Sequence, residues 1–154
     1  MTTSSPRAAG YAGSRTTVQK AATVVGAVFL LVGVLGFIPG ITTQYDTMGV
    51  AGHGSMAMLL GVFQVSILHN IVHLLFGVAG LAAARSASAA RRYLIVGGAV
   101  YLVLWIYGLI FGNSDSAANF IPVNTADNWL HLVLGVGMIA LGFLLTRNRT
   151  ADTR

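Results

Sequence analysis

Charged residues are scarce in this sequence, and their scarcity excludes a water-soluble globular protein. Asp, Glu, Lys and Arg make up 8% of the 154 residues, whereas hydrophobic residues make up 55%. A soluble domain carries about 25% charged residues, because its surface has to interact with water. We therefore expect lipid to be the main solvent of this chain, whose length fits a single domain.

Cysteine and glutamate are absent altogether, and their absence excludes several kinds of active site. Without cysteine there are no disulfides, no thiolate metal ligands and no cysteine nucleophile. His69 and His73 have the spacing of the metalloprotease motif H-E-x-x-H, but that chemistry needs a glutamate to activate zinc-bound water. Neither a G-x-S-x-G turn nor a glycine-rich phosphate loop occurs, so we expect a protein that is not an enzyme.

Four long apolar runs make up most of the sequence, and none of them contains Asp, Glu, Lys or Arg. A bilayer core about 30 Å thick requires about 20 helical residues, which is close to the length of each run. The sequence therefore predicts an all-α fold, a bundle of four transmembrane helices within a domain of residues 21–146. The four predicted spans cover about residues 21–38, 59–84, 93–111 and 129–146.

The segments outside this domain are predicted to be tails. Residues 1–20 are small and polar without a hydrophobic pattern, which predicts a disordered tail, and residues 147–154 form a second tail. Residues 21–38 have an alternative interpretation as a signal peptide. Pro39 and Gly40 follow this run in place of an Ala-x-Ala cleavage site, which favours a retained span.

The basic residues predict the orientation of the chain in the membrane. All of them lie before the first span, between the second and third spans, or after the fourth, and they are Arg7, Arg15, Lys20, Arg85, Arg91, Arg92, Arg147, Arg149 and Arg154. The two other loops, residues 39–58 and 112–128, contain only acidic charges. Because basic loops stay in the cytoplasm, we expect both termini to be cytoplasmic. The net charge of +5 then indicates attraction to anionic lipid headgroups and not to nucleic acid.

An internal repeat relates the second and fourth spans. Residues 70–78 and 128–136 share the pattern N-x-x-H-L-x-x-G-V, and a weaker alignment of the first and third spans pairs Gly36 with Gly108. Two duplicated helical hairpins would insert with the same orientation, so we expect them to be related by a pseudo-two-fold axis along the membrane normal. The alternative is a chance similarity between membrane helices of like composition.

A polar stripe runs along one face of the second span and another along the fourth. His69, Asn70 and His73 share an arc of the second span, and Asn128 and His131 form the matching stripe. Polar and small residues mark helix contacts in membranes, so these five residues are expected to face the bundle interior as a candidate polar intramembrane site. Thr125 is predicted to cap the fourth helix, with Asp127 in its first turn.

The histidines have two main interpretations. In the first, neutral His and Asn side chains join the helices through hydrogen bonds and no cofactor is bound. In the second, they bind a divalent metal or haem b, with His69, His73 and His131 as the candidate ligands. A path for a polar substrate or for protons is a third possibility, because ionisable residues within a membrane often mark a functional site.

Several segments together resemble an actinobacterial family of four-helix membrane proteins that is catalogued only as a domain of unknown function. They are residues 37–42, 60–66, 69–74 and 116–131, and the resemblance extends from about residue 18 to residue 146. It implies a bacterial plasma membrane as the location. It implies no activity, substrate or cofactor.

We therefore expect a non-enzymatic structural or partner-binding subunit of the membrane. Its environment is the lipid bilayer, and its expected partners are other membrane proteins or further copies of the chain. One alternative function is the haem- or metal-binding protein described above. The other is a transporter-like or sensor subunit that acts as an oligomer, because four short helices scarcely enclose a pathway.

Overall fold

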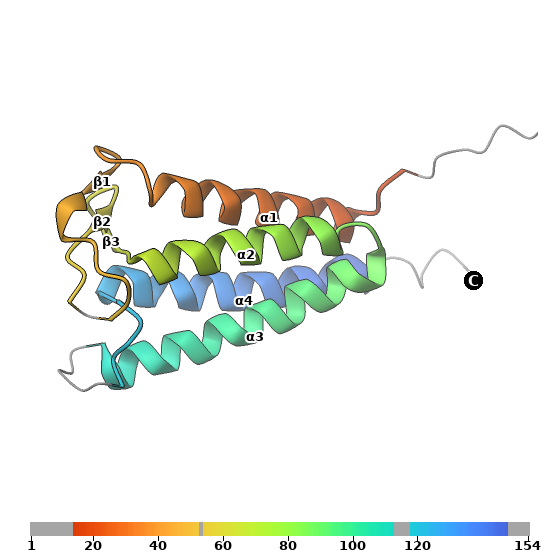
Figure 1. Ribbon diagram of the computed structural model, residues 1–154. Helices are drawn as coiled ribbons and strands as arrows, with labels where there is room; N and C mark the ends of the chain where they lie inside the picture. The colour runs from red at the N-terminus through yellow and green to blue at the C-terminus, as the bar shows by residue number, and fades with distance from the viewer. Residues whose placement is uncertain (1–13, 53, 113–117, 148–154) are drawn as a thin grey trace, which may run out of the picture.

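The computed structural model describes residues 14–52, 54–112 and 118–147, and this part of the chain folds into four α-helices with a small sheet (Figure 1). The sheet has the order β1-β2-β3, and its three two-residue strands are antiparallel. The helices are α1 (Thr17–Leu35), α2 (Ile67–Ala83), α3 (Ala87–Phe111) and α4 (Thr125–Arg147). The strands are β1 (Thr42–Thr43), β2 (Met58–Leu59) and β3 (Phe63–Gln64), and a short 3-10 helix, η1, covers Tyr45–Thr47.

The helices run up and down, so the connecting segments gather at two ends of the bundle (Figure 1). One end, called the turn end below, holds the start of α1, the short α2–α3 turn and the end of α4. The opposite end, called the loop end, holds the sheet and the segment that leads into α4. This arrangement places Arg15, Lys20 and Arg85 at the turn end and Asp46 and Asp127 at the loop end.

Three of the helices are long and apolar enough to cross a membrane, which identifies this as a membrane protein. They are α1, α3 and the segment Thr125–Thr146 of α4, whereas α2 is a shorter apolar helix. At a rise of 1.5 Å per residue, its 17 residues extend about 26 Å, slightly less than the bilayer core.

The predicted second span began at residue 59, but the helix begins at Ile67. Residues 58–64 instead form the β2–β3 hairpin, in which Leu60 and Gly61 adopt positive φ angles of 55° and 70°. An apolar run does not by itself distinguish a strand from a buried helical segment, so the hydrophobicity of this region concealed the hairpin. The hydroxyl of Ser66 then caps α2 by accepting a hydrogen bond from the His69 N–H at 3.1 Å.

The predicted tails also need correction. The N-terminal tail was expected to reach residue 20, but α1 begins at Thr17, where the Thr16 N–H donates to the Gln19 side chain at 3.0 Å. Gln19 and Lys20 therefore belong to the first helix. Residues 1–13 and 148–154, where most of the two tails were expected, lie outside the described residues.

Close backbone contacts join the helices into two pairs, α1 with α2 and α3 with α4. A Cβ atom placed on Gly26 would lie 2.9 Å from the Gly77 carbonyl oxygen, and one on Gly98 would lie 2.7 Å from the Gly135 carbonyl oxygen. Such distances leave no room for a side chain. Small residues at helix contacts allow this approach, which maximises van der Waals packing in lipid.

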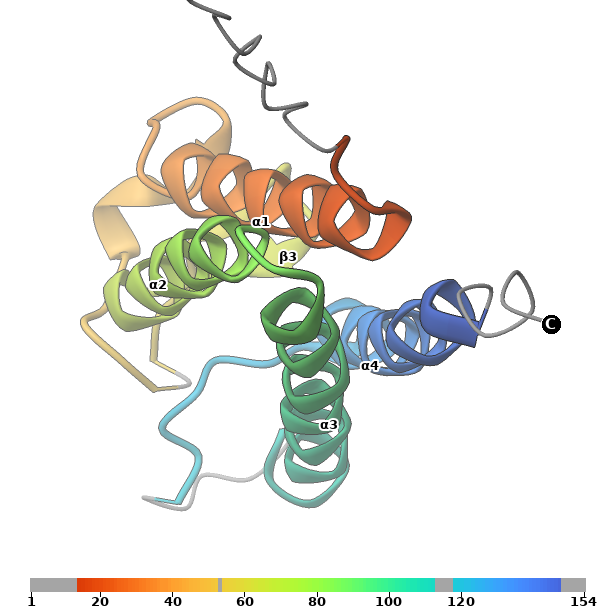
Figure 2. The ribbon, with the colours of Figure 1, turned by 90° about the vertical axis from the view of Figure 1, so that its right-hand side faces the viewer.

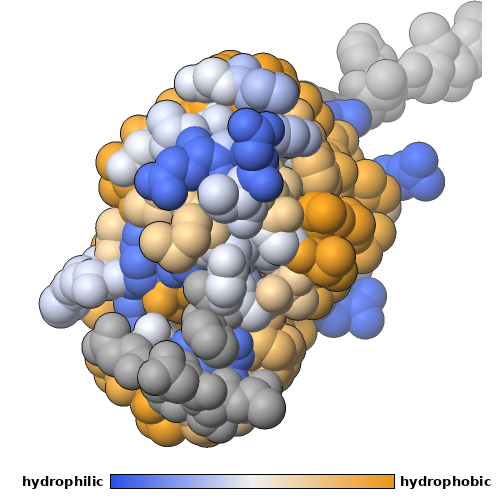
Figure 3. All heavy atoms as spheres, turned by 60° about the vertical axis from the view of Figure 1, so that its left-hand side comes forward, coloured by the Kyte–Doolittle hydropathy of each residue, from blue (hydrophilic) through white to orange (hydrophobic). Residues whose placement is uncertain are grey.

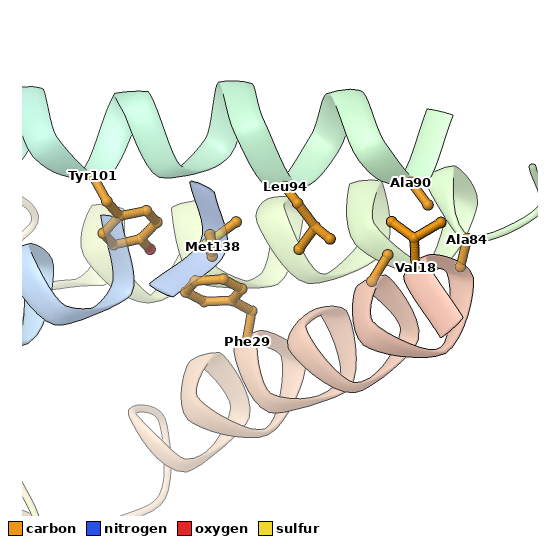
Figure 4. Packing of buried hydrophobic residues seen from close by; sticks show 8 residues of the cluster. Val18, Phe29, Ala84, Ala90, Leu94, Tyr101 and Met138 are labelled. Atoms are coloured by element: carbon orange, nitrogen blue, oxygen red, sulfur yellow. The ribbon is translucent and has the colours of Figure 1, made fainter. Parts of the chain in front are cut away.

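The two pairs meet across a core of larger side chains (Figure 4). Phe29 of α1, Leu94 and Tyr101 of α3 and Met138 of α4 are all buried in it. Valine and leucine side chains cover the outer faces of the helices, and hydrophilic residues gather over the loop end (Figure 3). This surface, apolar on its sides and polar at the loop end, suits a protein that lies in a bilayer.

A larger residue at a glycine contact should separate the helices of a pair. We expect Gly98→Ala to lower the free energy of unfolding by about 1–3 kcal/mol, because the added methyl group meets backbone atoms of α4. Gly137→Ala is the matched control on α4, since a Cβ there meets no described atom within 4 Å. Resistance to denaturation by SDS, followed by circular dichroism, measures both variants. Equal stability of the two would contradict the close packing of α3 on α4.

Candidate functional site

The five predicted site residues lie on the two helices that were expected to carry them. His69, Asn70 and His73 are on α2, and Asn128 and His131 are on α4. The exposed fraction is 0% for Asn70, 8% for His73 and 3% for His131, so these three side chains face the bundle interior. The helical spacing of the stripe therefore identified the buried face correctly.

The three histidines come together, and aromatic rings continue their arrangement. The rings of His69 and His73 stack with their centroids 4.6 Å apart, and the His69 and His131 centroids are 6.4 Å apart. Phe29 stacks on His73 at 5.7 Å, and Tyr101 packs edge-on against His131 at 5.4 Å. Phe29 and Tyr101 in turn stack on each other at 5.4 Å. We call His69, His73 and His131 the histidine cluster.

The two asparagines are not part of this cluster. Instead, each packs against a glycine of its partner helix, because a Cβ on Gly36 would overlap the Asn70 carboxamide and one on Gly108 would overlap that of Asn128. The Asn70 amide also lies 3.9 Å from the sulfur of Met48. The single polar site expected from the sequence is thus divided into one histidine cluster and two asparagine–glycine contacts.

Two small cavities lie beside the histidine cluster, and all three histidines line both of them. The first cavity, of about 130 Å³, lies among α2, α3, α4 and the segment before α4, with Tyr101 and Phe120 in its wall. The second, of about 100 Å³, lies among α1, α2, α4 and the sheet. The cluster therefore forms a partition between two mostly apolar spaces near the loop end.

The ring nitrogens of the cluster have unused hydrogen-bonding capacity. The Nδ1 atoms of His69, His73 and His131 are all buried, and no atom in the described ranges forms a hydrogen bond with any of them. The sequence predicts hydrogen bonds from the histidines to Asn70, Asn128, Ser66 or backbone carbonyls, and none is made at these Nδ1 atoms. A buried polar atom without a partner costs about 1–3 kcal/mol, so this cluster is an expensive feature of the bundle.

Asp127 is a buried residue at this site whose position the sequence did not reveal. Its carboxylate accepts hydrogen bonds from the Gln64 N–H at 2.9 Å and from the Asn124 N–H at 3.1 Å. The Asn124 side chain in turn accepts from the Asp127 N–H at 2.9 Å, so Asn124, and not Thr125, caps α4. The three-residue spacing of Asn124 and Asp127 is the signal that could have revealed this reciprocal pair. Asp127 thus fastens the sheet to the start of α4.

The geometry of the cluster does not fit a haem group. Two axial imidazoles need a flat gap between them that admits a macrocycle, whereas the His69 ring lies 4.6 Å from that of His73 and 6.4 Å from that of His131. The described part of the chain also contains no group of three His, Asp or Glu side chains arranged to hold a metal ion. The candidate ligands His69 and His73 stack face to face with their ring centroids 4.6 Å apart.

The effect of the unpartnered ring nitrogens on the free energy of unfolding can be measured by replacing a histidine. We expect His131→Leu to raise the free energy of unfolding by about 1 kcal/mol, because an apolar side chain of similar size needs no hydrogen bond there. Denaturation by SDS in mild detergent measures the change, with Leu94→Ala as a destabilising reference of about 2–5 kcal/mol. A marked loss of stability in His131→Leu would instead indicate that the imidazole holds the helices together.

Comparisons with known proteins identify the family of this chain. A family model described as Domain of unknown function (DUF4383) matches residues 19–144, in agreement with the resemblance to a family of unknown function. No curated protein and no solved structure matches the chain. The match covers all five predicted site residues and nearly the whole length of the four helices, so this chain belongs to the DUF4383 family.

Proposed function

We propose that this protein is a non-enzymatic binding protein of the membrane that accepts a small neutral ligand at the histidine cluster. The observation that carries the proposal is the set of three buried Nδ1 atoms, unpartnered among the described residues and situated between two cavities. Proteins accept unsatisfied polar groups at the expense of stability chiefly where a function requires them. A site of this kind provides hydrogen bonds to a ligand that enters.

This proposal is better supported than the packing role expected from the sequence. Histidines that only join helices would form hydrogen bonds across the helix contact, and the Nδ1 atoms form none with any described residue. The helix pairs are held instead by the glycine contacts of Gly26 with Gly77 and of Gly98 with Gly135. The close backbone contacts within each pair therefore provide cohesion without hydrogen bonds at these Nδ1 atoms.

The site is closed toward the turn end, which supports binding by a single chain more than transport through it. Phe29 and Tyr101 contact His73 and His131, and Met138 and fully buried Leu94 continue this core toward the turn end (Figure 4). A pathway across the membrane needs an opening on both sides. A transport function would require an oligomer that forms its pathway elsewhere.

A binding function without catalysis agrees with the chemistry of the site. The carboxylate closest in sequence to the cluster, Asp127, already accepts two backbone hydrogen bonds and serves to fasten the sheet. The chain contains neither glutamate nor cysteine that could supply a base or a nucleophile. We therefore assign the histidines to recognition of a ligand.

We also propose that the two helix pairs are duplicated hairpins related by a pseudo-two-fold axis along the membrane normal. Corresponding residues of the repeat make corresponding contacts in the two pairs, which supports a common origin more than chance. The matched contacts are Gly26–Gly77 with Gly98–Gly135, Gly36–Asn70 with Gly108–Asn128, and Phe29–His73 with Tyr101–His131. The starts of α2 and α4, at Ile67 and Thr125, also correspond in this alignment.

For the orientation, we propose that the turn end faces the cytoplasm across a bacterial plasma membrane. Basic residues gather there and acidic ones at the loop end, as the positive-inside rule requires. Both termini would then be cytoplasmic, and the histidine cluster would lie in the outer half of the bilayer. Lipid is the partner of the exposed apolar faces, and a second copy or another membrane protein could also lie against them.

Single introduced cysteines can test this orientation without background labelling, because the natural chain has no cysteine. Thr47→Cys at the loop end and Ser88→Cys at the turn end both lie at exposed positions. With intact cells, we expect a membrane-impermeant maleimide to label Thr47→Cys alone, and to label Ser88→Cys only after the membrane is opened. Labelling of Ser88→Cys in intact cells would contradict the orientation.

The same approach tests whether the cavity can be reached. Leu104 lines the first cavity, whereas Leu94, on the same helix, is fully buried in the core. In membranes, a small neutral methanethiosulfonate should modify Leu104→Cys at least about tenfold faster than Leu94→Cys, because burial excludes the reagent from the closely packed core. Mass spectrometry of the intact protein measures both rates. Equal, slow modification would contradict a ligand-accessible site.

A further inference from the structure

The larger of the two cavities has the size of a single ring. Its volume of about 130 Å³ is close to that of an engineered apolar cavity of about 150 Å³ that accepts benzene. Apolar side chains form most of its wall, with Leu68 and Val72 from α2, Leu104 from α3 and Phe120 from the segment before α4. The volume and the lining therefore suit a ring-sized, largely apolar group.

The polar groups of this cavity select a hydroxyl. Three imidazoles line it, and their buried Nδ1 atoms, left without partners by the described residues, can accept or donate according to the tautomer. A hydroxyl group donates one hydrogen bond and accepts others, so it can serve two imidazoles at once. No Lys, Arg, Asp or Glu is among the described residues that line this cavity, and a charged ligand would remain uncompensated there.

Two apolar residues of the cavity wall are also exposed at the surface of the bundle. Leu68 and Phe120 line the cavity and yet have exposed fractions of 40% and 54%, so they form its outer edge on the side of the bundle. Figure 2 shows that α3 leans away from α2 beyond their short turn, with the segment before α4 crossing the gap between them. Because this edge is apolar, a molecule dissolved in the bilayer can enter more easily than one dissolved in water.

We propose that the ligand is a neutral, lipid-soluble molecule with a ring-sized, hydroxyl-bearing head that enters from the bilayer between α2 and α3. Its head occupies the first cavity, its hydroxyl group bonds to the histidine cluster, and its apolar tail remains in the gap between the two helices. This assignment rests on the binding function proposed above and adds the class of ligand and the route of entry.

A matched pair of probes tests the role of the hydroxyl. The full-length protein, labelled with ¹⁵N-histidine and reconstituted in lipid nanodiscs, is titrated with 4-hexylphenol or with hexylbenzene. We expect 4-hexylphenol to shift the Nδ1 resonances of His69, His73 or His131 in a saturable manner, because a new hydrogen bond forms there. Hexylbenzene should bind at least about tenfold more weakly, since it lacks that bond.

A blocking residue tests the route. Leu68→Trp places a large side chain at the cavity rim, whereas Leu75→Trp places the same side chain at another exposed position of α2, outside the cavity. We expect the first variant to reduce the apparent affinity for 4-hexylphenol at least about tenfold and the second to leave it unchanged, as a steric block predicts.

The outcomes separate the ligand class from the underlying function. Equal shifts with both probes would overturn recognition of the hydroxyl, and an equal affinity in Leu68→Trp and Leu75→Trp would overturn the route. If neither probe shifts a histidine while Leu104→Cys is readily modified, the cavity is accessible and the ligand class is wrong. If Leu104→Cys is also unreactive, the binding function itself fails.

Discussion

The structure depends on the close backbone contact within each helix pair. Lipid offers no hydrophobic gain for bringing apolar helices together, so their association relies on van der Waals packing at short distance. Gly26 faces Gly77 and Gly98 faces Gly135 at distances that no side chain would permit. Because the cohesion of α1 with α2 and of α3 with α4 lies in these contacts, the space between the two pairs can contain larger and more varied side chains.

The space between the two helix pairs has different contents at the two ends of the bundle. Toward the turn end, the apolar core around Phe29, Met138 and Leu94 fills the space between the pairs. Toward the loop end, the histidine cluster lies between two cavities. This division supports the proposal of a binding site for a neutral ligand, with Phe29 and Tyr101 in contact with the imidazoles.

The sequence predicted the helices better than the segments between them. The apolar runs identified all four helices, and helical spacing placed His73 and His131 on buried faces, because a residue's angular position on a helix depends on spacing alone. The same reasoning failed at residues 59–64, where an apolar strand pair has the composition of a membrane helix. It also failed to separate Asn70 from the histidines, since a stripe identifies a face and does not reveal which neighbour each residue meets.

Composition and charge thus settled that this chain belongs in a membrane, since so few charged residues leave no other solvent, and the spacing of apolar and polar residues settled the number of helices and their inner faces. The tertiary structure decided how those faces are used. α3 diverges from α2 beyond their short turn (Figure 2), and the rotation of α2 directs Asn70 toward Gly36 and His69 toward His131 of α4. Tilt and rotation arise from packing between residues distant in the chain, which no local pattern encodes.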